Sequence, residues 1–599
     1  MQARKRWLIA PAAPPEFIAQ LAEVPPLVAQ ILFNRGFADR QAALRFLSGA
    51  AEEDNPFLLA GLERAVRVLR DALRKRQRIA VYGDYDADGV TATAILVQVL
   101  RALGGDVLPY IPDRNAEGYG LNPEAIETLA AQGVRVLVTV DCGSRSLPEV
   151  ALAQKRGMRV VVTDHHHLGP ALPVCEALVT PRREDSAYPC RDLAGVGVAY
   201  KLAQALLRTN ARVPLPGTCE KVTEQELLDL VALGTVADMV PLLGENHRLV
   251  RAGLQELNAA HRPGIHALLQ VAGLSPGEVN TNTISFVLAP RINAAGRIGQ
   301  AYKALELLLA RDMESALPLA EMLERLNRER QDLTLGAYQQ ARELVREQVE
   351  QEAPLLFVAA RDFPAGIIGL AAARLMDEFY RPVVVIEMGE SYSRGSARSI
   401  PGFHITEALE QVADLLVQFG GHAAAAGFTI ETARLPELQR RLQRVAAERL
   451  AQTDLERVLW IDAQVPLRAL SWDVYNAMLK LEPFGYGNPQ PVLVSPNVRV
   501  ATARVVGAQG QHLKLTLEDE TGLLWDAIAF RQGEWIERLP RYVDVAYVLE
   551  RNEWNGRIML QLVVQDLRFP EGKPAAAQVR REARSSLEAP YAWSGNSHS

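Results

Sequence analysis

Five short aliphatic runs alternate with helical segments between residues 55 and 215, and this alternation restricts the possible folds more than any other feature of the chain. Residues 91–103 and 122–133 have the apolar spacing of helices. The runs are RIAVYGD (78–84), DVLPYIP (106–112), VRVLVTVD (134–141), MRVVVTD (158–164) and ALVTP (177–181). Continuous runs rich in β-branched residues, alternating with helices, are typical of a parallel sheet covered on both faces. The sequence therefore predicts an α/β domain over residues 55–215.

The other segments predict further domains, because 599 residues are too many for one hydrophobic core. Residues 216–350 have a helical pattern and end in a long charged helix (315–350), which is expected to join two domains. Residues 453–570 contain short strands with Gly and Asn turns, which favours a β-barrel of the OB-fold type. The remaining expected segments are a helical lead-in (1–54), a second, smaller α/β domain (351–452) and a disordered tail (571–599).

Composition and charge narrow the class of protein only slightly. The net charge of −6 lacks the basic excess usual in nucleic-acid-binding domains, although a local positive groove is compatible with it. Four cysteines without CxxC spacing argue against a thiolate zinc site and suit a reducing compartment. The N-terminal region lacks the apolar segment of a signal peptide, and no run approaches the roughly 18–20 apolar residues of a membrane span. We therefore expect a cytoplasmic protein.

Acidic residues and histidines follow three of the predicted strands. Ligands of parallel α/β sheets bind outside the carboxyl ends of the strands. The residues at these ends are Asp84, Asp86 and Asp88 after the first strand, Asp141 after the third, and Asp164, His165 and His166 after the fourth. Carboxylates gathered in one crevice repel one another unless a multivalent cation binds among them. Asp and His ligands without thiolates favour Mn²⁺ or Mg²⁺, and two such ions would act on a phosphodiester.

Each of these motifs has a simpler interpretation when taken alone. GDYDADG is also a plausible turn, and a histidine pair after a strand is commonly an exposed loop. Their joint placement at three strand ends is what favours a metal centre. The third histidine, His167, has no assigned chemistry.

Taken together and in order, the motifs resemble those of the DHH phosphoesterase superfamily, whose name-giving motif is matched by Asp164-His165-His166. The resemblance covers roughly residues 55–570, and the matching stretches are YGDYDADGVTATAI, YIPDRNAEGYGLN, VTVDCG, TDHH, ALGTVADMVPL, RINAAGRIG, SARS, FGGHAAAAGF and EPFGYGNPQP. Within the superfamily, the chain is similar to the bacterial exonucleases that degrade single-stranded DNA 5′→3′. The resemblance therefore implies release of 5′-mononucleotides by two-metal hydrolysis, in DNA repair and recombination.

The resemblance also implies roles for individual residues around two Mn²⁺ or Mg²⁺ ions. The implied metal-site residues are Asp84, Asp86, Asp88, Asp141, Asp164, His165 and Asp238. Asp141 would bridge the ions, while Asp84 and Asp164 would either ligate them or orient the ligands. The implied catalytic residues are Asp141, His166 and Arg291, with His166 facing the scissile phosphate and Arg291 contacting phosphate beside the metals. By pattern alone, Asp238 is an ordinary residue of a helical region.

Substrate contacts are implied in two further motifs. Arg114, Ser396 and Arg398 would bind the terminal 5′ phosphate, for which the planar fork of arginine is suited. Gly420, Gly421 and His422 would bind the strand across a cleft from the metals, because glycines let a ligand approach the backbone. Read singly, each arginine is better interpreted as a solvated surface residue.

The expected barrel contains residues suited to a track for single-stranded DNA. These are Lys514, Trp525, Phe530 and Trp554, and aromatic stacking with basic backbone contacts is the usual arrangement on such a track. The same aromatics are equally expected in a barrel core, so no individual contact is assigned.

Two other functions share the motifs. A phosphodiesterase acting on short oligonucleotides or cyclic dinucleotides would have the same metal site, but the added barrel favours a polymer. A catalytically inactive replication scaffold would have lost metal carboxylates, which this chain keeps. The resemblance further implies single-stranded DNA as the partner, with a helicase and a single-strand-binding protein, no membrane partner, and a monomeric state.

Overall fold

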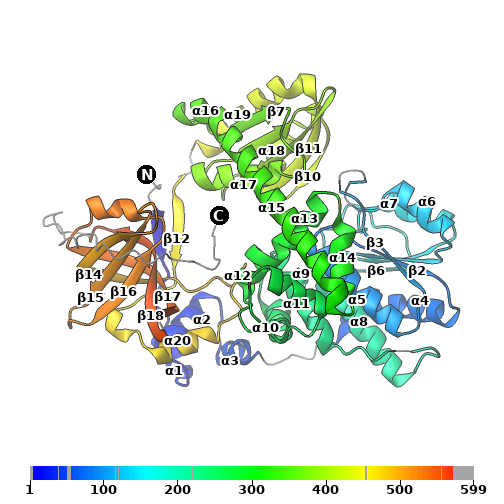
Figure 1. Cartoon of the computed structure of the whole chain (residues 1–599), viewed down its shortest axis with the longest axis horizontal. Helices are drawn as coiled ribbons and strands as arrows, with labels where there is room; N and C mark the ends of the chain where they lie inside the picture. The colour runs from blue at the N-terminus through cyan, green and yellow to red at the C-terminus, as the bar shows by residue number, and fades with distance from the viewer. Residues whose placement is uncertain are drawn as a thin grey trace. The chain divides into compact units, whose positions relative to one another are not determined.

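The computed structural model of the chain divides into two compact units (Figure 1). One unit consists of residues 1–54, 241–251 and 456–599, and the other of residues 55–240 and 252–455. The residues that the structure describes are 5–37, 39–49, 55–114, 117–118, 120–218, 220–451, 455–554 and 556–570. The expected disordered tail (571–599) lies outside them.

The larger unit begins with the predicted parallel sheet, in the strand order β3-β2-β4-β5-β6. All neighbouring strands are parallel. The strands are β2 (Ile79–Tyr82), β3 (Val107–Tyr110), β4 (Val136–Val140), β5 (Arg159–Thr163) and β6 (Ala177–Val179). Every residue of β4 is buried, as expected for a strand covered on both faces. The predicted parallel α/β fold is confirmed.

Helices cover the two faces of this sheet (Figure 1). On one face lie α4 (Leu62–Arg74), α5 (Ala87–Ala102) and α8 (Gly195–Arg212); α8 contacts both of the others, and all three contact the strands. On the other face α6 (Pro123–Ala131) and α7 (Leu147–Lys155) share a core with the strands. Helix α5 begins four residues before the predicted position of 91, because the side chain of Asp86 accepts hydrogen bonds from Asp88 N and Gly89 N and caps the helix.

A helical region follows the sheet. Its helices are α9 (Leu228–Ala237), α10 (Gly244–Ala259), α11 (Pro263–Val271), α12 (Thr281–Thr283), a π-helical turn (Ile284–Leu288), α13 (Ala289–Arg297), α14 (Ala301–Leu309) and α15 (Met313–Leu344). The long helix α15 packs against α11, α13 and α14, and against α17 of the next domain. It therefore joins the two α/β domains as predicted, although it ends at Leu344 and the short α16 (Arg346–Glu350) follows.

The second α/β domain has a mixed sheet in the order β10-β11-β9-β8-β7. Only β7 and β8 are parallel among these five strands, and the other neighbours are antiparallel. Its elements are β7 (Leu356–Ala360), α17 (Ile368–Phe379), β8 (Val383–Glu387), β9 (Tyr392–Arg398), α18 (Ile405–Glu410), β10 (Leu416–Gly421), β11 (Ala425–Glu431) and α19 (Leu435–Leu450). Helix α17 contacts α15 on one side and β8 on the other, which fixes the domain on the long helix.

The smaller unit contains the predicted barrel. Pairing of β14 with β17 closes the five strands β14 (Leu493–Val506), β15 (His512–Glu518), β16 (Leu524–Ala529), β18 (Arg557–Arg568) and β17 (Tyr542–Trp554). Short strands β12 (Arg457–Ile461) and β13 (Ala463–Gln464) and helix α20 (Trp472–Leu479) precede it. The barrel expected from the sequence is confirmed.

The N-terminal segment belongs to the core of the barrel unit. It contains helices α1 (Pro15–Gln20), α2 (Pro26–Asn34) and α3 (Arg40–Ser48), and also a strand, β1 (Lys5–Ile9), that pairs in parallel with β12. Phe17, Leu21 and Val28 share one hydrophobic core with Leu493 and Leu515 of the barrel. Sequence patterns did not indicate this association of the two ends of the chain. Within the described residues, none of the helices has both the length and the apolar character needed to cross a membrane.

Candidate metal centre

The acidic strand ends meet at the carboxyl edge of the parallel sheet, because β2, β4 and β5 are neighbours there. In each of three groups, one ligand atom per residue lies within 4.8 Å of the others. The groups are Asp84, Asp86 and Asp141; Asp141, His165 and His166; and Asp88, His165 and Asp238. We call the five aspartates and His165 the acidic cluster: Asp84, Asp86, Asp88, Asp141, Asp238 and His165.

Asp88 is held between the first turns of two helices. It lies in the first turn of α5, and its carboxylate accepts hydrogen bonds from Gly195 N (2.7 Å) and Val196 N (2.8 Å) at the start of α8. Burial and the neighbouring charge of Asp86 nevertheless raise its pKa to about 7. Gly195 also lets α8 pack closely against Asp141, since a Cβ at that position would lie 2.5 Å from Oδ1 of Asp141.

Asp141 has a strained backbone at the centre of the cluster. Its φ of +60° is in the left-handed region, which costs a non-glycine residue about 1–3 kcal/mol and concentrates at functional sites. Burial, followed by the charge of Asp88, holds its pKa well above the usual range. Oδ1 of Asp141 lies 3.1 Å from Nε2 of His165, yet both buried atoms lack a hydrogen-bond partner among the described residues.

His165 directs Nε2 toward three carboxylates. The distances to oxygen atoms of Asp141, Asp238 and Asp88 are 3.1, 3.6 and 3.8 Å. Burial lowers the pKa of the ring to about 3, so the imidazole is neutral at neutral pH. The ring also hydrogen-bonds to the backbone of Leu193, and Nε2 has no partner, so we assign that bond to Nδ1. A neutral imidazole held in this way presents the lone pair of Nε2 to a cation.

Asp238 reaches the cluster from the end of α9. Close packing of α9 on α5 brings it there, since a Cβ on Gly234 would lie 2.3 Å from Thr91 Oγ1 and 2.9 Å from Asp88 Oδ1. Burial and the charges of Asp88 and Asp86 raise the pKa of Asp238 to about 9. Burial and Asp86 also raise the pKa of Asp84.

These observations together show that the residues fit divalent metal ions. Buried carboxylates with raised pKa values, a neutral imidazole and two unpartnered buried ligand atoms form a site that is electrostatically unfavourable on its own. Oxygen-rich ligands with one imidazole and no thiolate suit Mg²⁺ and Mn²⁺. The predicted grouping of these side chains is therefore present in the structure.

Asp164 orients histidines within this arrangement. Its Oδ1 accepts from His165 N, His166 N and His166 Nδ1 (2.8 Å), and its Oδ2 accepts from Ser144 N (2.9 Å). Burial alone would raise the pKa of Asp164, but the hydrogen bond and charge of His166 lower it. Of the two roles that the sequence left open, the geometry favours orientation over ligation.

The glycine-rich turn of the second α/β domain brings His422 beside His167. The two rings have centroids 5.7 Å apart. Gly420, Gly421 and His422 are exposed at the end of β10. Gly421 has a φ of +152°, and a Cβ there would lie 2.4 Å from Ala425 O. His167, which had no assigned chemistry, therefore faces the domain expected to bind substrate.

An arginine pocket lies at the Asp84 end of the acidic cluster. Arg114 stacks on Tyr85 (5.2 Å from guanidinium carbon to ring centroid) and acts electrostatically on Asp84. Arg398 donates to Ser396 Oγ (3.1 Å), and a Cβ on Gly369 would lie 2.8 Å from Arg398 and 3.0 Å from Ser396 Oγ. The predicted trio of Arg114, Ser396 and Arg398 is thus placed together with the metal site nearby.

Two further arginines, which sequence reasoning missed, join this pocket. Burial, followed by Arg114, Arg330 and Arg398, lowers the pKa of Arg297 to about 10, so it remains charged at neutral pH. Its Nη1 donates to Gly366 O (3.1 Å), and the buried Nε of Arg330 has no partner among the described residues. We call Arg114, Arg297, Arg330, Arg398 and Ser396 the arginine pocket. The motif RINAAGRIG contains both Arg291, which was chosen from the sequence, and Arg297, which joins the arginine pocket. The motif was therefore identified, but Arg297 within it was not.

Arg291, the arginine chosen from the sequence, is held by an acid. Its Nε lies 2.7 Å from Glu324 Oε2, an ion pair without hydrogen-bond geometry, and its Nη1 donates to Val287 O (2.7 Å) in the π-helical turn. Its helix does contact the metal loop, because Asn293 Oδ1 accepts from Ala87 N (2.8 Å). The role of Arg291 as a phosphate contact stays a prediction.

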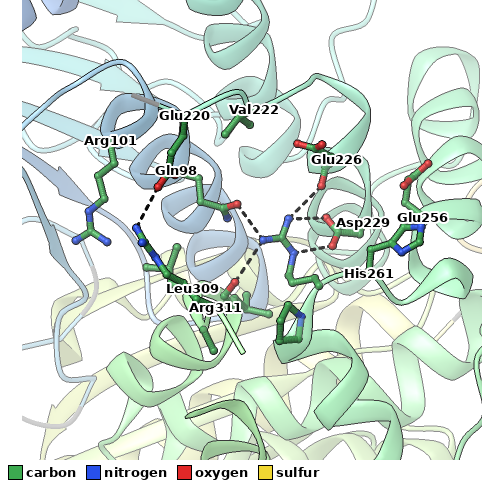
Figure 2. A pocket seen from close by; sticks show the side chains of 14 residues that line it. Gln98, Arg101, Glu220, Val222, Glu226, Asp229, Glu256, His261, Leu309 and Arg311 are labelled. Carbon is green, nitrogen blue, oxygen red and sulfur yellow. Dashed lines mark hydrogen bonds and ion pairs between the residues drawn. The ribbon is translucent and has the colours of Figure 1, made fainter. Parts of the chain in front are cut away.

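A separate pocket of about 360 Å³ lies at the other ends of α5 and α9 (Figure 2). Arg262 occupies its wall, with Nε 2.6 Å from Asp229 Oδ2. Further N–H groups of Arg262 donate to Asp229 Oδ1, Gln98 Oε1, Glu226 O and Leu308 O. This side chain therefore ties together α5, α9 and α14, and we interpret the pocket as structural.

The barrel residues separate into core and surface. Trp525 is 9% exposed and belongs to the hydrophobic core, so it is not a stacking platform. Phe530 is 44% exposed, and Lys514 pairs with Asp526 at 2.6 Å. The side chain of Trp554 lies outside the described part of the chain. Of the two aromatic residues in this set whose side chains the structure describes, Phe530 keeps the exposure that base stacking requires.

Comparison with known proteins gives consistent matches along the chain. The family models matched are "DHH family, N-terminal domain" (residues 78–235), "DHHA1 domain" (352–448) and "RecJ OB domain" (461–566). The chain is 38% identical to the single-stranded-DNA-specific exonuclease RecJ of Bacillus subtilis, over 92% of this chain and 69% of that protein. It is 35% identical to the protein of that name from Escherichia coli, over 91% of this chain and 96% of that protein.

Solved structures agree with these matches. A crystal structure of RecJ in complex with Mn²⁺ from Thermus thermophilus superposes with a TM-score of 0.81 at 34% identity, covering 96% of this chain and 81% of that chain. The corresponding Mg²⁺ complex superposes with a TM-score of 0.75 at 33% identity, covering 95% and 79%.

Proposed function

The chain belongs to the RecJ family of single-stranded-DNA-specific exonucleases, and we propose on this premise that it degrades single-stranded DNA from the 5′ end to 5′-mononucleotides. The observation that carries the proposal is the acidic cluster with an arginine pocket at one end. The protein is a metal-dependent hydrolase of DNA phosphodiesters that uses Mn²⁺ or Mg²⁺, the ions present in the related RecJ structures.

In this proposal, two ions are held on the two sides of the cluster. Asp84, Asp86 and Asp141 would hold one ion, and Asp88, His165 and Asp238 the other, with Asp141 bridging. When bound, the ions neutralise charge on the phosphodiester and supply Lewis-acid catalysis of its hydrolysis.

The protein's own residues position the substrate. Asp164 fixes the ring of His166 through Nδ1 (2.8 Å), so that His166 faces the scissile phosphate. Gly420, Gly421 and His422 bind the strand from the second α/β domain. Arg291 contributes a phosphate contact in this scheme, which requires its guanidinium to exchange Glu324 for phosphate.

We propose that the two α/β domains and helix α15 together select a single strand. Helix α15 fixes the position of the second domain through its contact with α17. A space that accommodates one strand excludes duplex DNA. The barrel adds a surface for the distal strand, to which exposed Phe530 belongs.

End-labelled strands test the function directly. We expect a 5′-labelled single strand to yield labelled mononucleotide at once, and a 3′-labelled strand to shorten progressively. A blunt duplex should resist degradation. Immediate release of label from the 3′ end would contradict the proposed polarity. Comparable rates on a dinucleotide and on a long strand would favour the alternative, a phosphodiesterase of short oligonucleotides or cyclic dinucleotides.

The arginine pocket predicts a preference for 5′-phosphorylated strands. Replacing Arg297 by Met keeps much of its volume but removes a charge that faces the phosphate, at about 1.5–3 kcal/mol for hydrogen bonds to charged groups. We expect kcat/KM on a 5′-phosphorylated strand to fall roughly 10- to 100-fold, with a smaller fall on the 5′-hydroxyl strand. The measurement is the ratio of kcat/KM on the two strands.

The matched control for this prediction is Arg346→Met. Arg346 is 73% exposed and pairs along its helix with Glu350, so the ratio should stay that of the wild type. If the Arg297→Met protein keeps the wild-type ratio of kcat/KM on the two strands, Arg297 does not bind the 5′ phosphate.

We propose that the protein acts as a cytoplasmic monomer in DNA repair and recombination, on strands that a helicase exposes and a single-strand-binding protein coats. The inactive replication scaffold is the weaker alternative, because the acidic cluster is intact. Failure of Mn²⁺ to bind would favour it.

A further inference from the structure

Four basic or imidazole side chains gather beside His166. Arg145 follows β4 and donates Nε–H to His167 O (2.8 Å), and Arg182 follows β6 and donates Nε–H to His165 O (2.7 Å). The ring of His167 faces that of His422 from the second α/β domain at 5.7 Å. We call Arg145, His167, Arg182 and His422 the basic cluster.

The basic cluster is suited to an anion. His422 is within electrostatic reach of both arginines and of His167. Arg145, His167 and His422 are exposed, so their polar groups are accessible to a ligand. Two carboxylates lie within electrostatic reach of Arg182: Asp192, which is 53% exposed and 3.5 Å away, and Asp238 of the acidic cluster. The two guanidinium groups and two imidazoles outnumber these carboxylates, and their N–H groups match the hydrogen-bond acceptors of a phosphodiester.

The position of the basic cluster relative to the acidic cluster gives its place along the strand. Arg114 of the arginine pocket acts electrostatically on Asp84, whereas Arg182 acts on Asp238. Asp84 and Asp238 belong to different metal-ligand groups. Within the second α/β sheet, Arg398 of β9 pairs with Ala425 of β11, and Ala425 O accepts from His422 N at the end of β10 (2.8 Å), so β11 separates the arginine pocket from the basic cluster.

We propose that the basic cluster binds the phosphodiester immediately 3′ of the scissile bond. The inference rests on the proposed function, in which the terminal 5′ phosphate occupies the arginine pocket and the scissile phosphate lies at the acidic cluster. A strand held in this way continues past the Asp238 end, where its next phosphate meets Arg145, His167, Arg182 and His422. The contact explains how a third histidine outside the family motif participates in binding.

A trinucleotide with one neutral linkage tests the proposal. The substrates are a 5′-phosphorylated trinucleotide and the same molecule with a methylphosphonate at its second linkage, the one 3′ of the scissile bond. For the wild type we expect kcat/KM to fall roughly tenfold with the neutral linkage, the size of a charge-assisted hydrogen bond. Arg145→Gln and His167→Gln should cleave the ordinary trinucleotide less efficiently and discriminate much less between the two substrates.

The control is Arg156→Gln, an exposed arginine that pairs with Glu127 away from the site, and it should discriminate as the wild type does. Variants that keep the full wild-type ratio, or a wild type indifferent to the neutral linkage, overturn the proposal. Failure of the proposed function is a different outcome, in which the wild type releases no 5′-mononucleotide from the ordinary trinucleotide.

Discussion

Replacement of Asp141 by Asn is expected to lower kcat on single-stranded DNA by about 10³-fold or more, equivalent to roughly 4 kcal/mol. Asp141 belongs to the group proposed to hold one ion, and its Oδ1 lies 3.1 Å from Nε2 of His165 in the group proposed to hold the other, so its loss affects both proposed ions. Asn is the suitable replacement because it tolerates the left-handed backbone at φ +60° better than Ala. DNA binding should be largely retained, because the arginine pocket and the basic cluster are unchanged.

The same variant should change stability in the opposite direction. In the metal-free protein, the pKa of Asp141 is raised above its unfolded value, so at neutral pH its ionised form destabilises the fold. Removing that charge is expected to raise the melting temperature of the metal-free protein by a few degrees. Mn²⁺ should raise the melting temperature of the wild type, and EDTA should reverse this, whereas the variant should respond much less.

Asp106→Asn is the matched control for this prediction. Asp106 immediately precedes β3, at the opposite edge of the same sheet, and pairs with Arg78 in an exposed salt bridge. Its loss should cost no more than about 1 kcal/mol and leave the Mn²⁺ response unchanged. An Asp141→Asn protein that keeps full activity, or that is stabilised by Mn²⁺ as much as the wild type, would contradict the metal assignment.

The sequence predicts those site residues that directly follow a strand. Asp84, Asp141 and Asp164 each follow an aliphatic run, and parallel pairing brings such ends to one edge by rule. The strand pattern fixes this pairing because each run is buried on both faces. The closed barrel is similarly predictable from short strands and turns.

Asp238, Arg297 and Arg330 were not predictable from pattern, because helix packing decides where they lie. Asp238 reaches the cluster only because Gly234 lets α9 approach α5, and α8 packs against Asp141 only because Gly195 lacks a Cβ. The family resemblance supplied Asp238, but neither glycine. Arg297 and Arg330 meet from different helices, and no spacing in the sequence encodes that meeting.

Arg262 is expected to have the largest effect on stability among the residues outside the metal site. Its side chain is 11% exposed and that of Asp229 is 7% exposed. Replacing Arg262 by Met leaves the Asp229 carboxylate buried without its partner and removes donors from Gln98 Oε1 and two backbone carbonyls. Breaking one partner of a buried ion pair costs about 3–5 kcal/mol. Denaturant unfolding should show a loss of that size.

The same substitution should also weaken metal binding, because Arg262 joins the far ends of two helices that hold cluster residues. Gln98 is on α5, which carries Asp88 in its first turn, and Asp229 is on α9, which Asp238 terminates. Loosening these ends increases the variation in distance between Asp88 and Asp238. We expect Arg262→Met to bind Mn²⁺ more weakly than the wild type, as measured by calorimetry under conditions in which the variant is folded.

Arg311→Met separates this effect from a general effect of the pocket. Arg311 lines the same pocket, is 79% exposed, and faces Glu220 at 3.5 Å (Figure 2), so its replacement should cost no more than about 1 kcal/mol and leave Mn²⁺ affinity unchanged. The double variant Arg262→Met/Asp229→Leu should recover part of the lost stability, since no unpaired charge remains buried. If Arg262→Met and Arg311→Met lose equally little stability, the ion pair does not hold the two helices, and the ligand geometry is set by the packing of α5 on α9 alone.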